Sequence, residues 1–194
     1  MKRTLDCDIV RFALRPNPKC LRHLAQYPDD PLRTPSVRGA IVRGSFDDEL
    51  FLVGRYIKPN LRLELFTVEH SQLLADGSID PTFRHFGRAW YHGGLESTQS
   101  GVLSAHARAV LLDQVFGLDV RIRPSLTGTF HIGLWFEEPT DVADGRAATS
   151  AAPSMGHSFN GGPLALISVP VAATGLGPLC TDPSPRVPLA SALP

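Results

Sequence analysis

The amino-acid sequence predicts an all-β fold: an antiparallel β-sandwich or barrel with irregular N- and C-terminal tails. Short runs of residues alternate between apolar and polar side chains, which is the period of a strand that buries one face. Turn-forming Gly, Pro, Asn and Asp residues separate these runs at short spacing. About seven such strands would fit a chain of this length around a single hydrophobic core.

Residues 1–36 are rich in proline, and we expect them to form an irregular arm. Proline cannot donate to a sheet ladder, and it breaks helices. Only residues 9–14 could pair as a strand. The arm should therefore add little to the fold. Its prolines are Pro16, Pro18, Pro28, Pro31 and Pro35.

The predicted β domain begins with residues 37–43, which alternate weakly. Two stronger runs follow, at residues 50–57 and 62–70. Pro59 and Asn60 stand between them and suit a tight turn, because proline fixes φ at the second turn position. These two runs are the best candidates for a β-hairpin.

Residues 86–92 form an aromatic-rich run that ends at a pair of glycines, and we expect a further strand there. Residues 102–116 fit two structures. Alternate residues from Leu103 to Leu111 are apolar, as in a strand, but a helical stripe with a stop at Gly117 is also present. The surrounding strands favour a strand here, with a turn of helix near residues 113–116.

Residues 129–137 show the clearest alternation in the chain. One side of this run is entirely apolar and is expected to be buried, whereas His131 and Glu137 on the other side should be more exposed. Across all the strands, the predicted buried set is Leu52, Phe66, Val68, Trp90, Phe130, Ile132, Leu134 and Phe136.

The last part of the chain contains one short strand between two irregular segments. Residues 140–163 are small and polar and are expected to form a long loop. An apolar run at residues 164–169 lies between two prolines and predicts a strand. Residues 181–194 form a predicted disordered tail, so the single β domain is expected to span residues 37–180.

The charge of the chain is balanced, with 19 Lys and Arg residues against 19 Asp and Glu residues. Nucleic acids and anionic membranes attract basic surfaces, so the balance argues against both as main partners. No apolar run approaches the roughly 20 residues of a membrane span. Asp6 and Asp8 interrupt any apolar signal core, so we expect no secretory signal in this chain.

The sequence contains no motif for a catalytic nucleophile, and we predict no catalytic residue. The Gly-x-Ser-x-Gly pattern is absent. Cys7, Cys20 and Cys180 have a spacing that matches neither a disulfide framework nor a zinc site, which leaves a Cys7–Cys20 bridge or unpaired thiols as alternatives. The acidic residues 47–49 could bind calcium, but calcium loops interleave their ligands, so a solvated turn is the better interpretation.

Three residues on the predicted strands are candidates for a ligand or interface site: Trp135, His131 and Tyr91. With the apolar side of residues 129–137 turned inward, Trp135 points outward beside His131. An exposed tryptophan can anchor a ligand or a partner. The alternative is that Trp135 packs beneath a loop such as residues 140–163, because a loop of that length is expected to pack against the strands.

Because imidazole is a common ligand of zinc, the seven histidines suggest a metal site as one hypothesis. Neither His-x-His nor His-Glu-x-x-His occurs. Convergence of His92, His106 and His131 would require three strands to turn these residues to one face. We therefore predict no metal site and no cofactor. The histidines are His23, His70, His85, His92, His106, His131 and His157.

Several stretches of the chain resemble an uncharacterised bacterial family of predicted exported β-rich proteins, over about residues 45–183. They read Leu-Val-Gly-Arg-Tyr-Ile-Lys-Pro-Asn (52–60), Ala-Trp-Tyr (89–91), Leu-Leu-Asp-Gln-Val-Phe-Gly (111–117), Thr-Phe-His-Ile-Gly-Leu-Trp-Phe (129–136), Phe-Asn-Gly (159–161) and Ala-Thr-Gly-Leu-Gly-Pro-Leu-Cys (173–180). The general style also looks like chordin-repeat and dismutase-like sandwiches, whose metal-ligand pattern is absent here.

The resemblance implies a β fold and an extracytoplasmic location, but it implies no activity. It also implies a cysteine partner for Cys180, at a place where this chain has Asp144 followed by Gly145.

Together these observations predict a non-enzymatic, extracytoplasmic β-sandwich module that binds a protein or small-molecule ligand or has a structural role. The alternative is a His-dependent metalloenzyme on a β-sandwich, which would use His131 with His92 or His106.

We predict that the purified protein holds no stoichiometric transition metal, because such a site needs three or four converging ligands. Elemental analysis of untagged protein measures this directly. About one zinc or copper ion per chain, lost on His131→Ala, would contradict the prediction and support the metalloenzyme.

Overall fold

The computed structural model describes residues 9–112, 115–116, 127–137, 162–173 and 175–181. Within these residues eight strands form one antiparallel sheet. The sheet strands are β1 Ile9–Pro16, β2 Ser36–Val42, β3 Asp48–Arg55, β4 Arg62–Val68, β5 Ala89–Glu96, β6 Leu103–Ala109, β9 His131–Phe136 and β10 Leu164–Ser168. A separate short ladder joins β7 (Val115–Phe116) to β8 (Thr127–Gly128), and the short helices are η1 Pro18–Cys20, α1 Leu21–Leu24 and η2 Pro31–Arg33.

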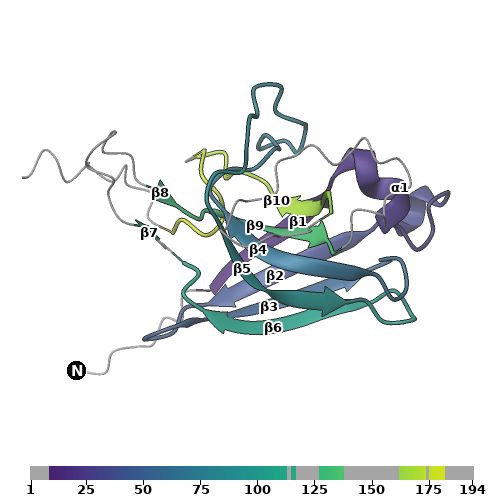
Figure 1. The fold of residues 1–194 in the computed structure, drawn as a ribbon, viewed down its shortest axis with the longest axis horizontal. Helices are drawn as coiled ribbons and strands as arrows, with labels where there is room; N and C mark the ends of the chain where they lie inside the picture. The colour runs from purple at the N-terminus through teal and green to yellow at the C-terminus, as the bar shows by residue number, and fades with distance from the viewer. Residues whose placement is uncertain (1–8, 113–114, 117–126, 138–161, 174, 182–194) are drawn as a thin grey trace, which may run out of the picture.

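The order of strands across the sheet is β5-β4-β9-β10-β1-β2-β3-β6. The sheet curls until its two edge strands, β5 and β6, come close to each other, so that it forms a nearly closed barrel (Figure 1). The predicted antiparallel all-β class is therefore confirmed. Of the two predicted architectures, the structure is closer to the barrel.

The prediction of an irregular arm is wrong for the described part of residues 1–36. β1 lies inside the sheet, with β10 on one side and β2 on the other. The prolines occupy positions that need no backbone N–H: Pro16 is the last residue of β1, and Pro18 and Pro31 stand in the first turn of η1 and η2. These prolines mark the ends of elements, and η1 and α1 lie between them.

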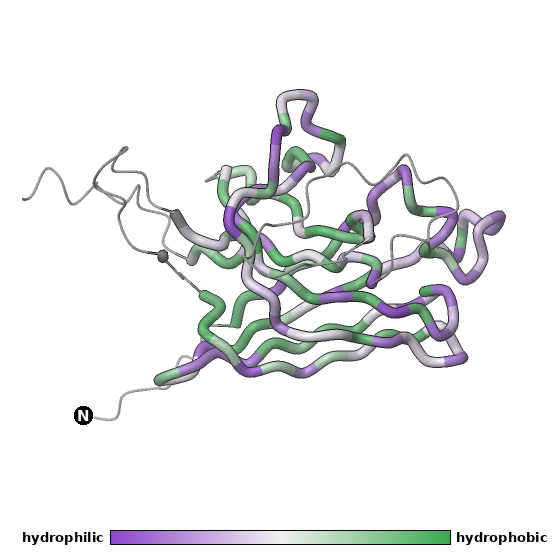
Figure 2. Tube along the Cα trace, in the orientation of Figure 1, coloured by the Kyte–Doolittle hydropathy of each residue, from purple (hydrophilic) through white to green (hydrophobic). Residues whose placement is uncertain are grey.

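The inside of the barrel is filled with apolar side chains. Residues of high and low hydropathy follow each other along the strands, as the colouring of the trace shows (Figure 2). α1 closes one end of the barrel, where Leu24 is fully buried and the His23 ring meets Phe136 edge to face at 5.2 Å. Inward residues of six strands that are buried in this core include Leu14, Ile41, Leu52, Leu65, Ile132 and Leu166.

β9 is buried on both faces, unlike the half-exposed strand that its alternation predicts. The period of two is correct, since Ile132, Leu134 and Phe136 all pack in the barrel core. The opposite face is covered by the segment that follows β4, which leaves His131 only 3% exposed and Trp135 0% exposed. The prediction of a more exposed His131 is therefore wrong. Trp135 points out of the barrel, and the alternative in which it packs beneath a connecting segment is confirmed, with residues 69–88 as that segment.

Most of the predicted buried set is confirmed. Phe130 and Trp90 are the exceptions. Phe130 is half-buried, and Trp90 is 44% exposed because β5 is an edge strand of the sheet. The confirmed residues are Leu52, Phe66, Val68, Ile132, Leu134 and Phe136.

β3 and β4 do not form the predicted hairpin. β3 pairs with β2 and β6, whereas β4 pairs with β5 and β9, so residues 56–61 cross between distant strands. The predicted turn at Pro59 and Asn60 is present, but the Ser97 hydroxyl holds it by donating to the Lys58 carbonyl (2.5 Å). A turn signal reports local backbone shape and does not identify the strands that pair.

The strand alternative for residues 102–116 is confirmed by β6, and the helical alternative is wrong there. The helical turn expected near residues 113–116 is wrong at Val115 and Phe116, which form β7.

Cys20 is a buried free thiol, which favours the unpaired alternative for this cysteine.

Several expectations fall outside the described residues. They concern residues 182–194, most of the predicted loop at residues 140–163, and Cys7. Along the part of the chain that is described, no helix is long and apolar enough to cross a membrane.

The acidic residues 47–49 do not form a solvated turn. Asp48 is 6% exposed, and its Oδ2 accepts hydrogen bonds from the backbone N–H groups of Leu111 and Leu112, both at 2.8 Å. Asp47 is instead paired with Arg108 at the surface (3.3 Å). Asp48 therefore ties the start of β3 to the chain that leaves β6.

Replacing Asp48 with Ala is expected to lower the free energy of unfolding by about 2–4 kcal/mol, because two buried N–H groups lose their acceptor. The matched control is Asp47→Ala, which removes an exposed ion pair and is expected to cost less than about 1 kcal/mol. Urea unfolding of both variants measures the difference. Equal losses would show that the Asp48 carboxylate does not stabilise the turn.

Candidate functional site

Residues 69–88, which join β4 to β5, cover the outer face of β4, β9 and β10. The segment rises above the barrel at the top of Figure 1. The Trp135 ring packs edge to face against Phe86 of this segment (5.1 Å between centroids) and against Phe66 of β4 (5.4 Å). A second hydrophobic cluster therefore lies outside the barrel, since these strands carry apolar side chains on both faces.

Hydrogen bonds hold this covering segment in place. The Ser71 hydroxyl donates to the Ser168 carbonyl at the end of β10 (2.9 Å) and accepts from the Leu73 backbone N–H (3.1 Å). Further along, the carboxylates of Asp76 and Asp80 each accept from the backbone N–H two residues later, at 2.8 and 2.7 Å. Such local bonds give a defined shape to a segment that has little regular secondary structure.

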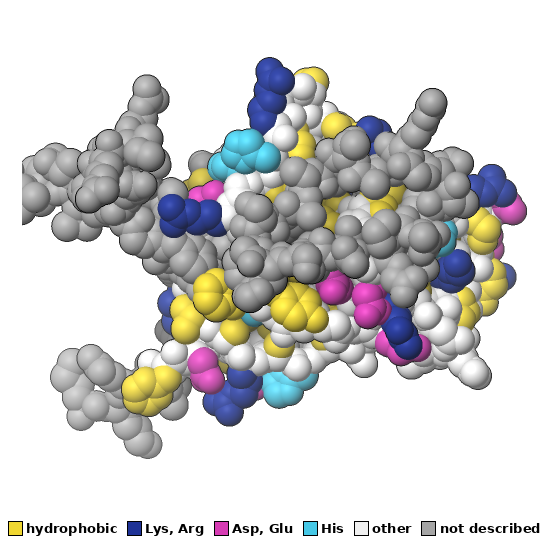
Figure 3. All heavy atoms as spheres, viewed as in Figure 1, with side chains coloured by type: hydrophobic (Ala, Val, Ile, Leu, Met, Phe, Trp, Pro, Cys, Tyr) yellow, Lys and Arg dark blue, Asp and Glu magenta, His cyan; other side chains and the backbone are white. Residues whose placement is uncertain are grey.

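A cleft of about 700 Å³ opens between this segment and residues 170–176, beside the start of β9. Its volume lies in the range of about 300–1,000 Å³ that is typical of small-molecule sites. Histidine side chains reach the surface in the upper part of Figure 3, where residues 69–88 lie. The apolar residues of the cleft include Leu73, Phe83, Phe130, Val171 and Leu176, and the polar ones include Glu69, His70, Asp80, Arg84, His85 and His131.

His131 lies in the wall of the cleft and is neutral at neutral pH. Its Nδ1 is 3.2 Å from the Ser168 carbonyl oxygen, which can only accept, so Nδ1 carries the proton and Nε2 is the acceptor. Burial lowers the pKa of His131 to about 4, and the nearby His70 contributes in the same direction. Gly177 packs against the ring, where a Cβ would overlap the Phe130 carbonyl.

The other polar groups of the cleft include hydrogen-bond donors. His85 Nδ1 accepts from the Gly87 backbone N–H (3.1 Å), so its Nε2 bears the proton. The rings of His85 and His70 lie 5.9 Å apart. The carboxylates of Asp80 and Glu69 already accept the backbone N–H groups of Thr82 and Arg88, at 2.7 Å each. The cleft therefore offers donors from His85 and Arg84, while its acids are partly satisfied.

A serine hydroxyl lies beside His131, but it is not placed as a nucleophile. Ser168 Oγ is 3.1 Å from His131 Nδ1, and it also accepts from the Ile132 backbone N–H at 3.1 Å. Ser168 is 0% exposed, so a substrate has no access to its hydroxyl. The pair fixes the orientation of the imidazole and the end of β10.

The three histidines considered as metal ligands lie apart. His92 is bonded to Thr67 (3.1 Å), and His106 stands on the exposed face of β6, stacked on Phe51 at 4.6 Å. His131 lies at the cleft. Across the described parts of the chain, no group of three or more His, Cys, Asp and Glu side chains has the arrangement to hold a metal ion.

The structure does not bring the three sequence-predicted site residues together. His131 lines the cleft. Trp135 is buried four residues further along β9, under residues 69–88 and not at a surface. Tyr91 is 46% exposed on β5, its ring lies 5.1 Å from Phe66, and it does not line the cleft.

Most cleft residues were not predicted from the sequence. His70, His85, Phe83 and Val171 lie in connections with no hydrophobic period, so no pattern marks them as neighbours. One signal was available: the Asp-x-Ser and Asp-x-Thr steps at residues 76–82 indicate ordered turns, and an ordered long connection is often functional.

Comparison of the chain with protein-family models, with curated proteins and with solved structures finds no match. The resemblance seen in the sequence stays a prediction, as does the extracytoplasmic location that it implies.

We expect the free energy of unfolding to fall as the pH is lowered from about 6.5 to about 4. Burial lowers the folded-state pKa of both His131 and His92 to about 4. In this window the unfolded chain binds more protons than the folded one, so stability is full above about pH 6.5 and is lost below it. Each histidine contributes up to about 1.4 kcal/mol per pH unit, measurable by urea unfolding.

The matched variant is His131→Asn, which cannot titrate but keeps a side-chain donor for the Ser168 carbonyl. This variant should remove about half of the decrease in the free energy of unfolding that occurs as the pH is lowered. Burial and the nearby Glu137 raise the pKa of Glu64, which acts in the opposite direction. The difference between the variant and the unchanged protein isolates His131. An identical pH dependence in both would contradict the assignment.

Proposed function

We propose that this protein is a non-catalytic binding module that holds a small molecule in the cleft beside β9. The single observation that supports this most is the cleft itself, which has an apolar wall and a few convergent polar groups. Its walls rest on the hydrogen-bonded segment 69–88 and on the barrel, so the site is largely formed before a ligand arrives. A preformed site binds with less ordering cost.

The chemistry of the cleft favours a ligand with an apolar body and one anionic or hydrogen-bond-accepting group. Phe83, Leu73 and Val171 would contact the apolar body. Arg84 and the protonated Nε2 of His85 would donate to the polar group. Glu69 and Asp80 already accept hydrogen bonds from backbone N–H groups, which reduces the attraction for a cationic ligand.

The proposal places no chemical step in the cleft. Ser168 is buried and His131 is held by its Nδ1–H, so neither is arranged to attack a bound molecule. Binding in the cleft agrees with the non-enzymatic module expected from the sequence. An extracytoplasmic location stays a prediction, and fractionation of the producing cell would test it.

Val171→Asp is expected to weaken binding of anilinonaphthalene sulfonate, an apolar fluorophore with one sulfonate, by at least about ten-fold. The side chain of Val171 is 43% exposed in the cleft wall, so a carboxylate there would both repel the sulfonate and hydrate the apolar wall. Fluorescence titration of the native protein measures the dissociation constant.

The matched control is Val110→Asp, because Val110 is similarly exposed (52%) but is not one of the residues of the cleft. Thermal melting of both variants verifies that they remain folded. The proposal is overturned if the two substitutions change the dissociation constant equally, or if the native protein does not bind the fluorophore.

A further inference from the structure

The outer face of β1, β2 and β3 is exposed, in contrast to the covered face of β4, β9 and β10. Alternate residues along these three strands are exposed, and none of them belongs to the cluster under residues 69–88. Four exposed arginines stand on this face, which we call the arginine face: Arg11, Arg15, Arg38 and Arg55.

The strand register places the four arginines around a centre. Arg38 on β2 is directly opposite Ala13 on β1 and Val53 on β3. Arg11 and Arg15 lie two residues to either side of Ala13, so both are diagonal neighbours of Arg38. Diagonal neighbours in an antiparallel sheet are about 7–8 Å apart.

Arg55 completes the arrangement on the other side of Arg38. It is directly opposite Ser36, which lies two residues before Arg38 on β2. Ala40 and Ala13, which lie between Arg38 and the arginines of β1, are small and uncharged, and Val53, opposite Arg38 on β3, is the larger apolar neighbour.

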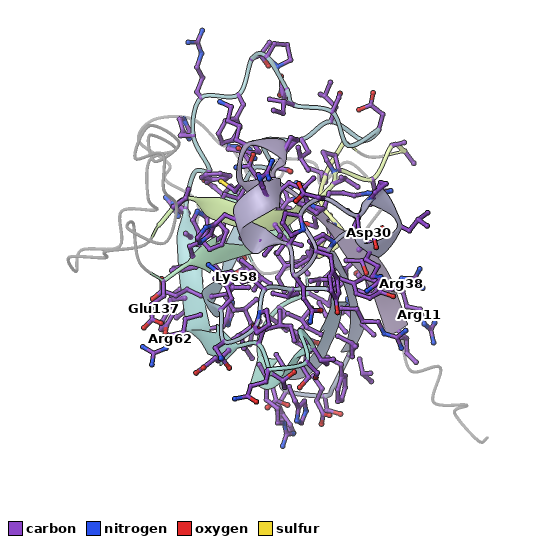
Figure 4. The ribbon with its side chains drawn as sticks, turned by 90° about the vertical axis from the view of Figure 1, so that its right-hand side faces the viewer. Arg11, Asp30, Arg38, Lys58, Arg62 and Glu137 are labelled. Atoms are coloured by element: carbon purple, nitrogen blue, oxygen red, sulfur yellow. The ribbon has the colours of Figure 1, made fainter. Side chains whose placement is uncertain are left out.

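No acid neutralises this face within the described residues. None of the four arginines has an ion pair there with an Asp or Glu. Glu49, further along β3, is engaged by Arg108 (3.8 Å) and His106 (3.4 Å). In Figure 4, Arg11 and Arg38 project from the same flank as Asp30, and Asp30 is paired with Arg33 at 3.0 Å.

We propose that the arginine face is a docking surface for an acidic segment of a partner protein, bound in an extended conformation. Side chains on one face of an extended chain repeat every 6.6–6.8 Å or so, about the spacing of diagonal neighbours on the sheet. Acidic residues at alternate positions would therefore meet successive arginines. Arginine binds carboxylates in a bidentate manner, and all four cations here are arginine.

An acidic segment fits better than a nucleic acid. The chain has zero formal net charge, so it lacks the long-range positive field by which polyanions are attracted. A local patch of four arginines matches a short acidic stretch in both charge and length. Arg15 lies beside Gly77 of residues 69–88, but none of the four arginines lines the cleft, so this surface can be tested without reference to the cleft ligand.

The test is fluorescence anisotropy with a labelled peptide of alternating Glu and Ser, about twelve residues long, at about 0.05 M and 0.15 M salt. We expect Arg38→Gln, at the centre of the face, to weaken binding at least about ten-fold. The control is Arg22→Gln, an exposed arginine of α1 paired with Asp29, which should change affinity less than about two-fold.

Two further probes complete the experiment. A peptide of the same composition with its Glu residues in one block should bind more weakly, and equal binding would overturn the extended arrangement. Tighter binding of an oligothymidylate, lost in Arg38→Gln, would assign the face to nucleic acid and overturn the proposal. Absence of peptide binding at the lower salt concentration, with both variants folded by thermal melting, would also overturn it.

Discussion

The pairing of β1 with β10 is the interaction on which the rest of the structure depends. It joins the strands β5, β4, β9 and β10 to the strands β2, β3 and β6, and no other ladder among the described residues connects these two groups. Asn17, directly after β1, strengthens the junction: its backbone N–H donates to Ala165 (2.8 Å) and its side chain donates to Leu164 (3.0 Å). Because Asn17 is buried, loss of these bonds would leave polar groups unpaired in the core.

The two groups of strands differ in what covers them, and this difference produces both proposed sites. β4, β9 and β10 are apolar on both faces, so residues 69–88 fold over them and the cleft forms at the edge of that cover. β1, β2 and β3 bury apolar side chains on the inner face, and their uncovered outer face carries the arginines together with exposed Ile9, Phe51 and Val53. Arg62, paired with Glu96 and Glu137 across β5, β4 and β9, has acidic neighbours that Arg38 lacks (Figure 4).

Local patterns predict the strands well, because alternation records how a side chain leaves the backbone. The strand at residues 37–43 and the inward side of β9 follow directly from it. Pairing partners, however, are set by contacts between distant residues, so the turn at Pro59 could not reveal that β3 and β4 separate. Alternation also cannot say whether the polar side of a strand meets water. His131 and Trp135 are therefore buried, and the cleft, built from irregular connections, was not foreseen.

The position of β10 has a consequence for how the molecule forms. Leu14 of β1 lies opposite Ser168 of β10, so the sheet joins residues from nearly opposite ends of the described chain. Folds dominated by such distant pairings have high contact order and fold slowly. During synthesis, β1 leaves the ribosome early and must wait for β10 before its second edge is covered. We expect the growing chain to expose an unpaired, aggregation-prone edge of β1 until β10 is synthesised. A chaperone that covers this edge would prevent aggregation during that interval.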